Sequence, residues 1–122
     1  MDFEEIIRDF SKIQEKILGL ILFGSRVSGE QTWKSDIDVC IVVGDKDKVK
    51  EVWDWVLESG VTEKYDVKIF ELLPLKLKVS VMRGMVLWTK DLGELQYYLW
   101  KYRGIWDDEL LAKKKLGLRI FG

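Results

Sequence analysis

One stretch decides the fold of this chain: LFGSRVSGEQTWKSDIDVCIVV, residues 22–43. It begins inside an almost wholly apolar run, residues 17–23 (ILGLILF), which stops at a glycine and is typical of a buried strand ending in a tight turn. It ends with residues 37–43 (IDVCIVV), which are rich in β-branched side chains and stop at Gly44, so they predict a second central strand. The polar, glycine-containing segment between them is therefore a loop between two strands.

Two aspartates stand at the start of the second strand. Asp36 and Asp38 are two positions apart, so both carboxylates point from the same face of the strand. Like charges this close repel each other unless a cation lies between them, and hard divalent cations prefer oxygen ligands. The pair therefore predicts a metal site, with Mg²⁺ as the expected ion.

A third acid is available on a later strand. Residues 65–72 (YDVKIFEL) alternate as a strand does, which places Asp66 and Lys68 on one face, where we expect them to pair. If this strand lies beside residues 37–43, Asp66 completes a three-carboxylate site. The alternatives for the third carboxylate are Glu63 and Glu71.

A Gly-Ser pair follows the first strand. The backbone N–H groups of Gly24 and Ser25 and the serine hydroxyl can face a ligand there, and glycine permits the close approach that a phosphate needs. Alone, the pair indicates only a turn. Together with three carboxylates it supplies what two-metal nucleotidyl transfer requires: one ion lowers the pKa of the acceptor hydroxyl and the other neutralises the triphosphate.

The remaining segments predict helices around this sheet. The predicted helices cover residues 2–16, 45–58 and 74–84 and a long segment from Asp91, and residues 85–89 predict a short edge strand. Residues 74–84 also alternate like a strand, but a proline at the start and a glycine at the end favour a helix. We expect an α/β (α+β) fold, a small mixed sheet of about four strands flanked by helices, in a single domain over residues 1–122.

Composition excludes several classes of protein. The chain has 122 residues with 48% hydrophobic side chains, enough for a core, and its single cysteine, Cys40, permits no internal disulfide and is expected in the core. It has no histidine, so the usual zinc and catalytic-triad chemistries lack their ligands and bases. The net charge of −1 argues against direct nucleic-acid binding, and no apolar run approaches the roughly 20 residues that span a bilayer. We expect a cytoplasmic protein with no membrane partner.

The motif as a whole resembles the minimal nucleotidyltransferases (MNT) of the DNA polymerase β superfamily. Their pattern is Gly-Ser, ten residues, then Asp-x-Asp, and it falls on Gly24, Ser25, Asp36 and Asp38. An Arg after the Gly-Ser pair, here Arg26, is also common in the family. The resemblance covers about residues 17–90 and implies a polymerase-β-like nucleotidyltransferase fold.

The resemblance also implies an activity. Similar members are the antitoxin half of toxin–antitoxin pairs whose partner is a HEPN ribonuclease, and they transfer AMP from ATP to a tyrosine of that toxin. By this resemblance, Asp36, Asp38 and Asp66 hold two Mg²⁺ ions, and Asp66 is the acid nearest the acceptor. The triphosphate of ATP is expected at Gly24 and Ser25, and Arg26 is either a clamp on it or a surface charge.

Two other functions stay open at this stage. The chain could be a non-catalytic neutraliser that binds its partner and keeps the site as a nucleotide-binding module. It could also nucleotidylate a small molecule, which would require a second domain or a dimer to build the acceptor pocket. Exposed aromatic side chains are enriched at interfaces, and the candidates for partner contact or homo-oligomer contact are Trp33, Trp55, Tyr97 and Trp100.

Overall fold

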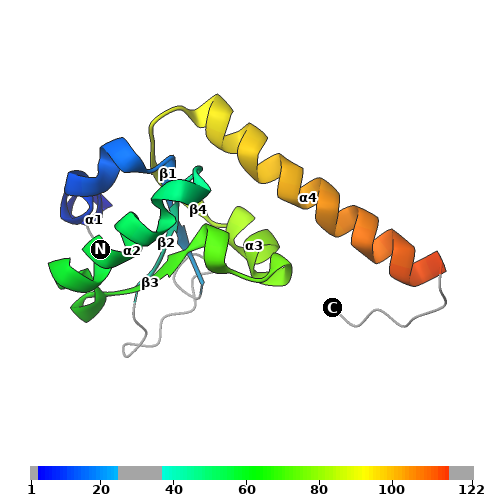
Figure 1. Cartoon of the computed structure of the whole chain (residues 1–122), viewed down its shortest axis with the longest axis horizontal. Coiled ribbons are helices and arrows are strands. Elements are labelled where there is room, and N and C mark those ends of the chain that lie inside the picture. Colours follow the sequence, from blue (N-terminus) through cyan, green and yellow to red (C-terminus); the bar gives the residue numbers. More distant parts are fainter. Residues whose placement is uncertain (1–2, 25–36, 116–122) are drawn as a thin grey trace.

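The protein folds as a four-stranded mixed sheet between two layers of helices (Figure 1). The structure, a computed structural model, describes residues 3–24 and 37–115. Its strands are β1 (Gly19–Phe23), β2 (Ile37–Val42), β3 (Tyr65–Ile69) and β4 (Met85–Thr89), in the order β3-β2-β1-β4. Its helices are α1 (Phe3–Asp9), α2 (Val49–Ser59), α3 (Leu75–Met82) and α4 (Leu92–Lys115). The predicted fold class and the predicted edge strand are thereby confirmed.

The strand directions decide which loop ends meet. β1 pairs antiparallel with both β2 and β4, whereas β2 and β3 are parallel. The end of β1 therefore lies at the same edge of the sheet as the starts of β2 and β3. This edge carries the residues on which the sequence places the chemistry.

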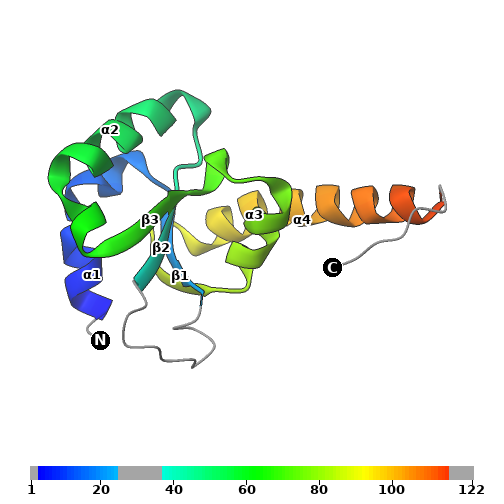
Figure 2. The same ribbon diagram turned by 90° about the horizontal axis from the view of Figure 1, so that it is seen from below.

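Each face of the sheet is covered by a different pair of helices, as Figures 1 and 2 show. On one face, α1 and α2 bury a cluster that includes Phe10, Val39 and Val56. On the other, α3 and α4 bury a cluster that includes Cys40 and Leu95. Alternate residues of β2 point to opposite faces, so its run of apolar side chains supplies both clusters. α4 continues past the sheet as a projecting arm (Figures 1 and 2).

The predicted capping residues are found, although the predicted helix over residues 45–58 begins with a 3₁₀ turn, Lys46–Lys48, and becomes α-helical only at Val49. Asp45 accepts a hydrogen bond from the Asp47 N–H at the turn before α2, and Gly60, with φ of +82°, ends that helix. Asp91 caps α4 by accepting from the Glu94 N–H at 3.0 Å. Within residues 74–84, Leu75–Met82 form α3, which confirms the choice of helix over strand.

Two further predicted elements are cut short by a 3₁₀ turn. The predicted helix over residues 2–16 divides into α1 and a 3₁₀ turn, Ser11–Lys16, because the backbone leaves the α conformation at Phe10 (φ −104°, ψ 8°). Phe10 is fully buried there against Trp55 and Tyr65. The predicted strand over residues 65–72 ends at Ile69, since a second 3₁₀ turn, Phe70–Leu72, follows it. Within residues 3–24 and 37–115, no helix is long and apolar enough to cross a membrane.

A charged hydrogen bond attaches α1 to the start of β3. The Tyr65 hydroxyl donates to the Asp9 carboxylate, and the Lys64 ammonium lies 3.2 Å from the same group. The tyrosine hydroxyl and the neighbouring Lys64 together lower the pKa of Asp9 below its ordinary value. The ionised carboxylate therefore stabilises the folded state above the unfolded pKa, and this contribution is lost as the pH falls through the folded pKa.

We expect Asp9→Asn to lower the free energy of unfolding by about 1 kcal/mol at pH 7, since the charge-assisted bond becomes a neutral one. At a pH below the pKa of both states, the variant and the parent should be equally stable. Urea unfolding at pH 7 and under acid conditions checks this, with Asp54→Asn on the exposed side of α2 as the matched control. An equal loss at both pH values would contradict the assignment.

Candidate active site

The end of β1 and the starts of β2 and β3 bring three of the predicted site residues side by side. Phe23, which Gly24 follows, is the partner of Asp38 across β1 and β2, and Asp38 is the partner of Asp66 across β2 and β3. The condition for adding Asp66 to the site, that its strand lies beside residues 37–43, is thus met. Asp66 and Asp38 stand 28 residues apart in sequence and on neighbouring strands in the fold.

The two aspartates point from the same face of the sheet. Register partners on adjacent strands share a face, and neighbouring strands lie about 4.8 Å apart. Cys40 and Val42, which alternate with Asp38 on β2, belong to the cluster under α3 and α4, so the carboxylates lie on that side. Both are partly exposed at the edge of the sheet. Two adjacent, solvent-accessible carboxylates are a donor set that suits a hard divalent cation.

Gly24 is required by its conformation and by its neighbour. Its φ of +88° lies in the left-handed region, which residues other than glycine rarely adopt. A Cβ at this position would come within 2.2 Å of the Asp38 Oδ2 atom. The sequence attributed this glycine to the close approach of a phosphate. The structure shows that the turn also leaves room for the Asp38 carboxylate.

Lys68 is the basic residue beside these acids. Its ammonium lies 3.4 Å from the Asp66 Oδ1 atom, which confirms the predicted pair. Nearly half of each side chain is exposed, so solvent screens the pair and it adds little to stability. Its effect is local: it places a positive charge beside the Asp66 carboxylate.

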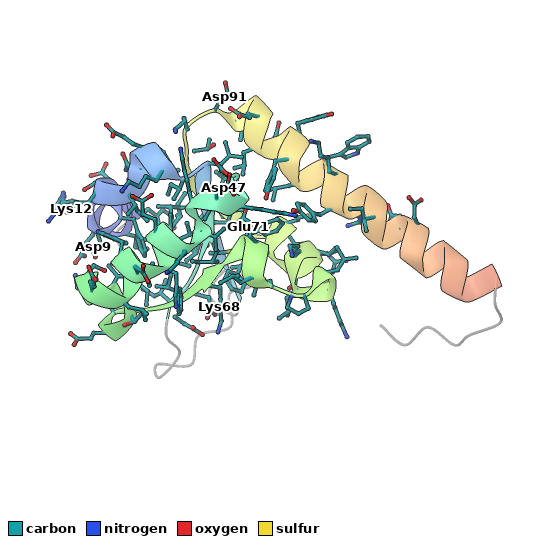
Figure 3. The ribbon with its side chains drawn as sticks, viewed as in Figure 1. Asp9, Lys12, Asp47, Lys68, Glu71 and Asp91 are labelled. Carbon is teal, nitrogen blue, oxygen red and sulfur yellow. The ribbon has the colours of Figure 1, made fainter. Side chains whose placement is uncertain are left out.

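Glu71, the first alternative for the third carboxylate, is committed elsewhere. Its two oxygens accept from the N–H groups of Val43 and Gly44 at 3.0 and 2.9 Å and from the Tyr98 hydroxyl at 2.6 Å. These partners lie beyond the far end of β2, and Figure 3 shows Glu71 between the sheet and α4. Glu71 is thus a structural clamp that fixes α4, while burial and the Glu71 carboxylate raise the pKa of the Tyr98 hydroxyl.

The second alternative, Glu63, lies on the wrong face of the sheet. It ends a 3₁₀ turn, Val61–Glu63, and lines a hollow with Trp55 on the side of α1 and α2. Of the three acids considered, Asp66 is the one that the structure places beside Asp38.

Sequence analysis missed the part played by Glu71 and Tyr98, because their contact joins residues 27 positions apart. The sequence did indicate that Tyr98 faces the core: it follows the buried Leu95 by three residues and so lies on the same face of the last helix.

Three predicted site residues fall outside the residues that the structure describes: Ser25, Arg26 and Asp36. Within residues 3–24 and 37–115, no group of three acidic or cysteine side chains gathers closely enough to hold a metal ion. The described part of the candidate site therefore consists of Gly24, Asp38, Asp66 and Lys68, and the catalytic and binding roles assigned to all of the site residues stay predictions.

Cys40 lies next to Asp38 on the same face but takes no part in the site. It is fully buried, and burial raises the pKa of its thiol far above the ordinary value. A thiol held in the neutral form is a poor nucleophile. The prediction that Cys40 is a core residue is confirmed.

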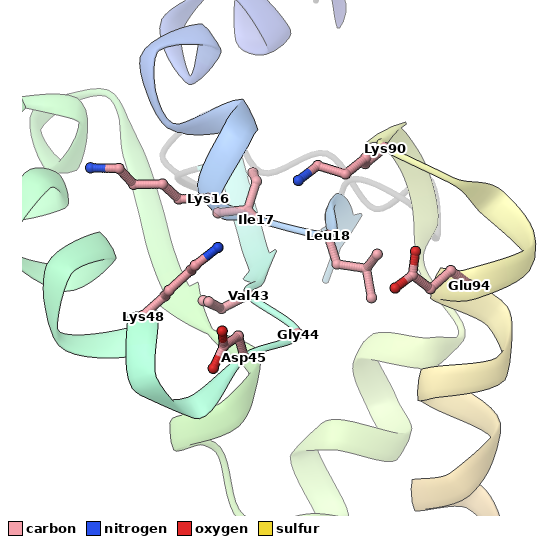
Figure 4. A pocket seen from close by; sticks show the side chains of 9 residues that line it. All are labelled: Lys16, Ile17, Leu18, Val43, Gly44, Asp45, Lys48, Lys90 and Glu94. Carbon is pink, nitrogen blue, oxygen red and sulfur yellow. The ribbon is translucent and has the colours of Figure 1, made fainter.

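A small cavity lies at the opposite edge of the sheet (Figure 4). Its volume is about 160 Å³, and three lysines line it: Lys16, Lys48 and Lys90. Lys16 forms an ion pair with Glu51, and the Lys90 ammonium donates to the Glu15 carbonyl at 2.9 Å. Two of the three cations are thus engaged, and the cavity is separated from Asp38 by the length of β2.

The aromatic candidates for partner contact divide into two groups. Trp55 is partly buried, with its ring centroid 5.9 Å from that of Phe10, so the prediction of a freely exposed Trp55 was wrong. The reason is the turn after Phe10, which the sequence did not predict and which brings that ring onto α2. Tyr97 and Trp100 are exposed on α4, by 60% and 67%, as predicted. Trp33 lies outside the described residues.

The sequence was compared with protein families and with known proteins. The family model described as "Polymerase beta, Nucleotidyltransferase" matches residues 4–92. Two proteins of Methanocaldococcus jannaschii, both provisionally named protein adenylyltransferases, are similar in sequence. MJ1547 is 37% identical over 93 residues, which are 76% of this chain and 72% of the relative. MJ0141 is 33% identical over 79 residues, or 60% of this chain and 80% of the relative.

Solved structures share the fold. A chain of a toxin–antitoxin crystal structure with AMP-PNP matches with a TM-score of 0.73 at 18% identity, over 95% of both chains. A second match is to a chain in the structure of a complex, "tri-AMPylated Shewanella oneidensis HEPN toxin in complex with MNT antitoxin". Its TM-score is 0.66 at 17% identity, over 93% of this chain and 91% of that chain. At these identities the likeness is one of fold alone.

Proposed function

This chain belongs to the polymerase β nucleotidyltransferase family, and we propose that it transfers AMP from ATP to a tyrosine hydroxyl of a HEPN-type toxin and so acts as its antitoxin. The observation that carries the proposal is the register of Asp38 with Asp66 beside the Gly24 turn. The relatives named as protein adenylyltransferases and the fold shared with toxin–antitoxin structures support the same choice of acceptor.

The carboxylates fit the divalent ions that nucleotidyl transfer uses. Asp38 and Asp66 offer oxygen ligands from one face, and Asp36, two residues before Asp38, is the third expected ligand. When bound, two Mg²⁺ ions would lower the pKa of the acceptor hydroxyl and neutralise charge on the triphosphate.

The protein's own residues would accept the proton, bind the phosphates and compensate negative charge. Asp66, on the strand next to Asp38, would accept the proton of the acceptor hydroxyl. The Gly24–Ser25 turn would bind the β- and γ-phosphates through backbone N–H groups and the serine hydroxyl, with Arg26 as a further cation. Lys68 would offset part of the negative charge of Asp66 before ATP arrives.

The openness of the site favours a macromolecular acceptor. The Asp66 side chain is 44% exposed and stands on an edge strand of the sheet, so a large acceptor can approach this carboxylate. A small acceptor needs a concave pocket that buries most of its surface. A protein can instead carry its own hydroxyl to an open edge and obtain binding energy from the surrounding surface.

Intact-mass measurement tests the proposal. The protein is incubated with α-labelled ATP, Mg²⁺ and a HEPN-family toxin, and both proteins are weighed. We expect the toxin to gain the mass of one or more AMP units at a tyrosine and to lose its ribonuclease activity. Complex formation with neutralisation but without a mass gain would contradict the enzyme and support a binding antitoxin. Transfer to an aminoglycoside or other small alcohol, with none to the toxin, would support the small-molecule alternative.

A further inference from the structure

The chain has four tyrosines, and their hydroxyls are not equally available. The Tyr65 hydroxyl donates to Asp9, and the Tyr98 hydroxyl donates to Glu71. The Tyr102 hydroxyl lies 3.4 Å from that of Tyr98, in the same partly buried cluster. Tyr97 is 60% exposed, and its hydroxyl has no hydrogen-bond partner among the residues that the structure describes.

Two neighbours make the surface around Tyr97 suitable for a nucleotide. The Trp100 ring stacks on the Tyr97 ring at a centroid distance of 6.4 Å and is 67% exposed, so it offers a flat face to a purine. The Lys101 ammonium lies 4.7 Å from the centre of the Tyr97 ring and is the nearby cation for a phosphate. A hydroxyl acceptor, a stacking surface and a cation thus occur within two turns of one helix.

We propose that Tyr97 is a self-modification site, to which the enzyme transfers AMP from ATP when no toxin is engaged. This inference rests on the proposed function, because it requires a protein nucleotidyltransferase with a tyrosine acceptor. In the reaction, the Tyr97 oxygen forms a bond to the α-phosphorus of ATP, and the bond from that phosphorus to the pyrophosphate oxygen breaks. The hydroxyl proton passes to Asp66, and pyrophosphate leaves with its electron pair.

The transfer must occur between two copies of the chain. Tyr98, the neighbour of Tyr97, is held by Glu71 next to Val43, at the end of β2 opposite to Asp38. Asp38 and Val43 are five residues apart, which is about 17 Å along the strand at about 3.3 Å per residue. Leu95 and Tyr98 face the sheet, whereas Tyr97 and Trp100 lie on the exposed side of α4. The Tyr97 hydroxyl therefore cannot reach the acids of its own chain while α4 is in place.

A mixing experiment separates the donor from the acceptor. Tyr97→Phe serves as the donor, since it keeps every residue of the proposed site, and Asp38→Asn serves as the acceptor, since it keeps Tyr97. With ATP and Mg²⁺ and no toxin, we expect AMP on the Asp38→Asn chain, with peptide mapping placing it at Tyr97. Asp38→Asn/Tyr97→Phe should stay unlabelled, whereas Asp38→Asn/Tyr102→Phe, the matched control, should be labelled normally. For the parent protein, the initial rate should rise with the square of its concentration.

The outcomes distinguish this inference from the function on which it rests. If the Tyr97→Phe donor labels a HEPN toxin but not the Asp38→Asn chain, self-modification is overturned and the proposed function stands. Labelling at another residue, or a rate that is first order in protein, also overturns the assignment to Tyr97 in a second copy. If the parent labels neither the toxin nor itself, the proposed function fails and the inference fails with it.

Discussion

Replacing Asp38 with asparagine is expected to abolish nucleotidyl transfer while leaving the fold intact. The carboxylate lies beside Asp66 on one face of the sheet, where a divalent ion needs both charges. Losing the stabilisation that bound metal gives the transition state, about 4 kcal/mol, corresponds to roughly a thousandfold loss in rate. The substitution also removes one of two adjacent negative charges, so the free energy of unfolding should change by less than about 1 kcal/mol.

Asp38→Asn should be compared with substitutions of three other acidic residues, each of which has a different expected role. Asp66→Asn should lose transfer as Asp38→Asn does, because the two residues form one site. Glu71→Gln should unfold more readily, since it weakens the bonds to Val43, Gly44 and Tyr98, but it should retain transfer. Asp54→Asn, on the exposed side of α2, should change neither quantity. Full activity in Asp66→Asn together with loss in Glu71→Gln would show that the third carboxylate has been assigned wrongly.

Gly24→Ala is expected to lose both activity and stability. A residue with a Cβ at φ of +88° costs about 1–2 kcal/mol, and here that Cβ would meet the Asp38 carboxylate at 2.2 Å. Either the turn or the carboxylate must shift. A displacement of about 1 Å at a reacting centre costs on the order of a hundredfold in rate, so we expect transfer to fall by at least that factor.

Gly60→Ala is the matched control for this prediction. Gly60 has a φ of +82°, close to that of Gly24, but nothing lies within 4 Å of the place where its Cβ would be. Both variants should therefore lose similar stability from backbone strain, and Gly24→Ala alone should lose transfer. Thermal unfolding and single-turnover transfer rates of the two purified variants measure the two effects. Equal retention of activity would mean that the Gly24 turn does not position Asp38.

The parts of the fold that follow from short-range signals could be predicted. The strands around residues 17–23 and 37–43 are marked by apolar runs that stop at glycines, and α4 begins after a capping aspartate, Asp91. The glycine-serine turn and the paired aspartates could likewise be proposed as a site, because their spacing is a property of one loop and one strand.

Long-range contacts account for what could not be predicted. The break in the first helix depends on Phe10, which gains more by burial against Trp55 and Tyr65 than by continuing the helix. The same contact covers one side of Trp55, whose position on its own helix indicated an exposed ring. The glutamate side chain of Glu71 suits a metal ion as well as backbone N–H groups, and only its place at the far end of the sheet decides between the two.

The sequence by itself therefore determined the family and was enough to predict the first half of the site, because Gly24, Ser25, Asp36 and Asp38 lie within fifteen residues and their pattern is local. Only the tertiary structure decided which acid stands beside them. The parallel pairing of β3 with β2 puts Asp66 in register with Asp38 and carries Glu71 to the other edge. Strand pairing is fixed by the burial of two faces against four helices, and no segment of the chain contains that information alone.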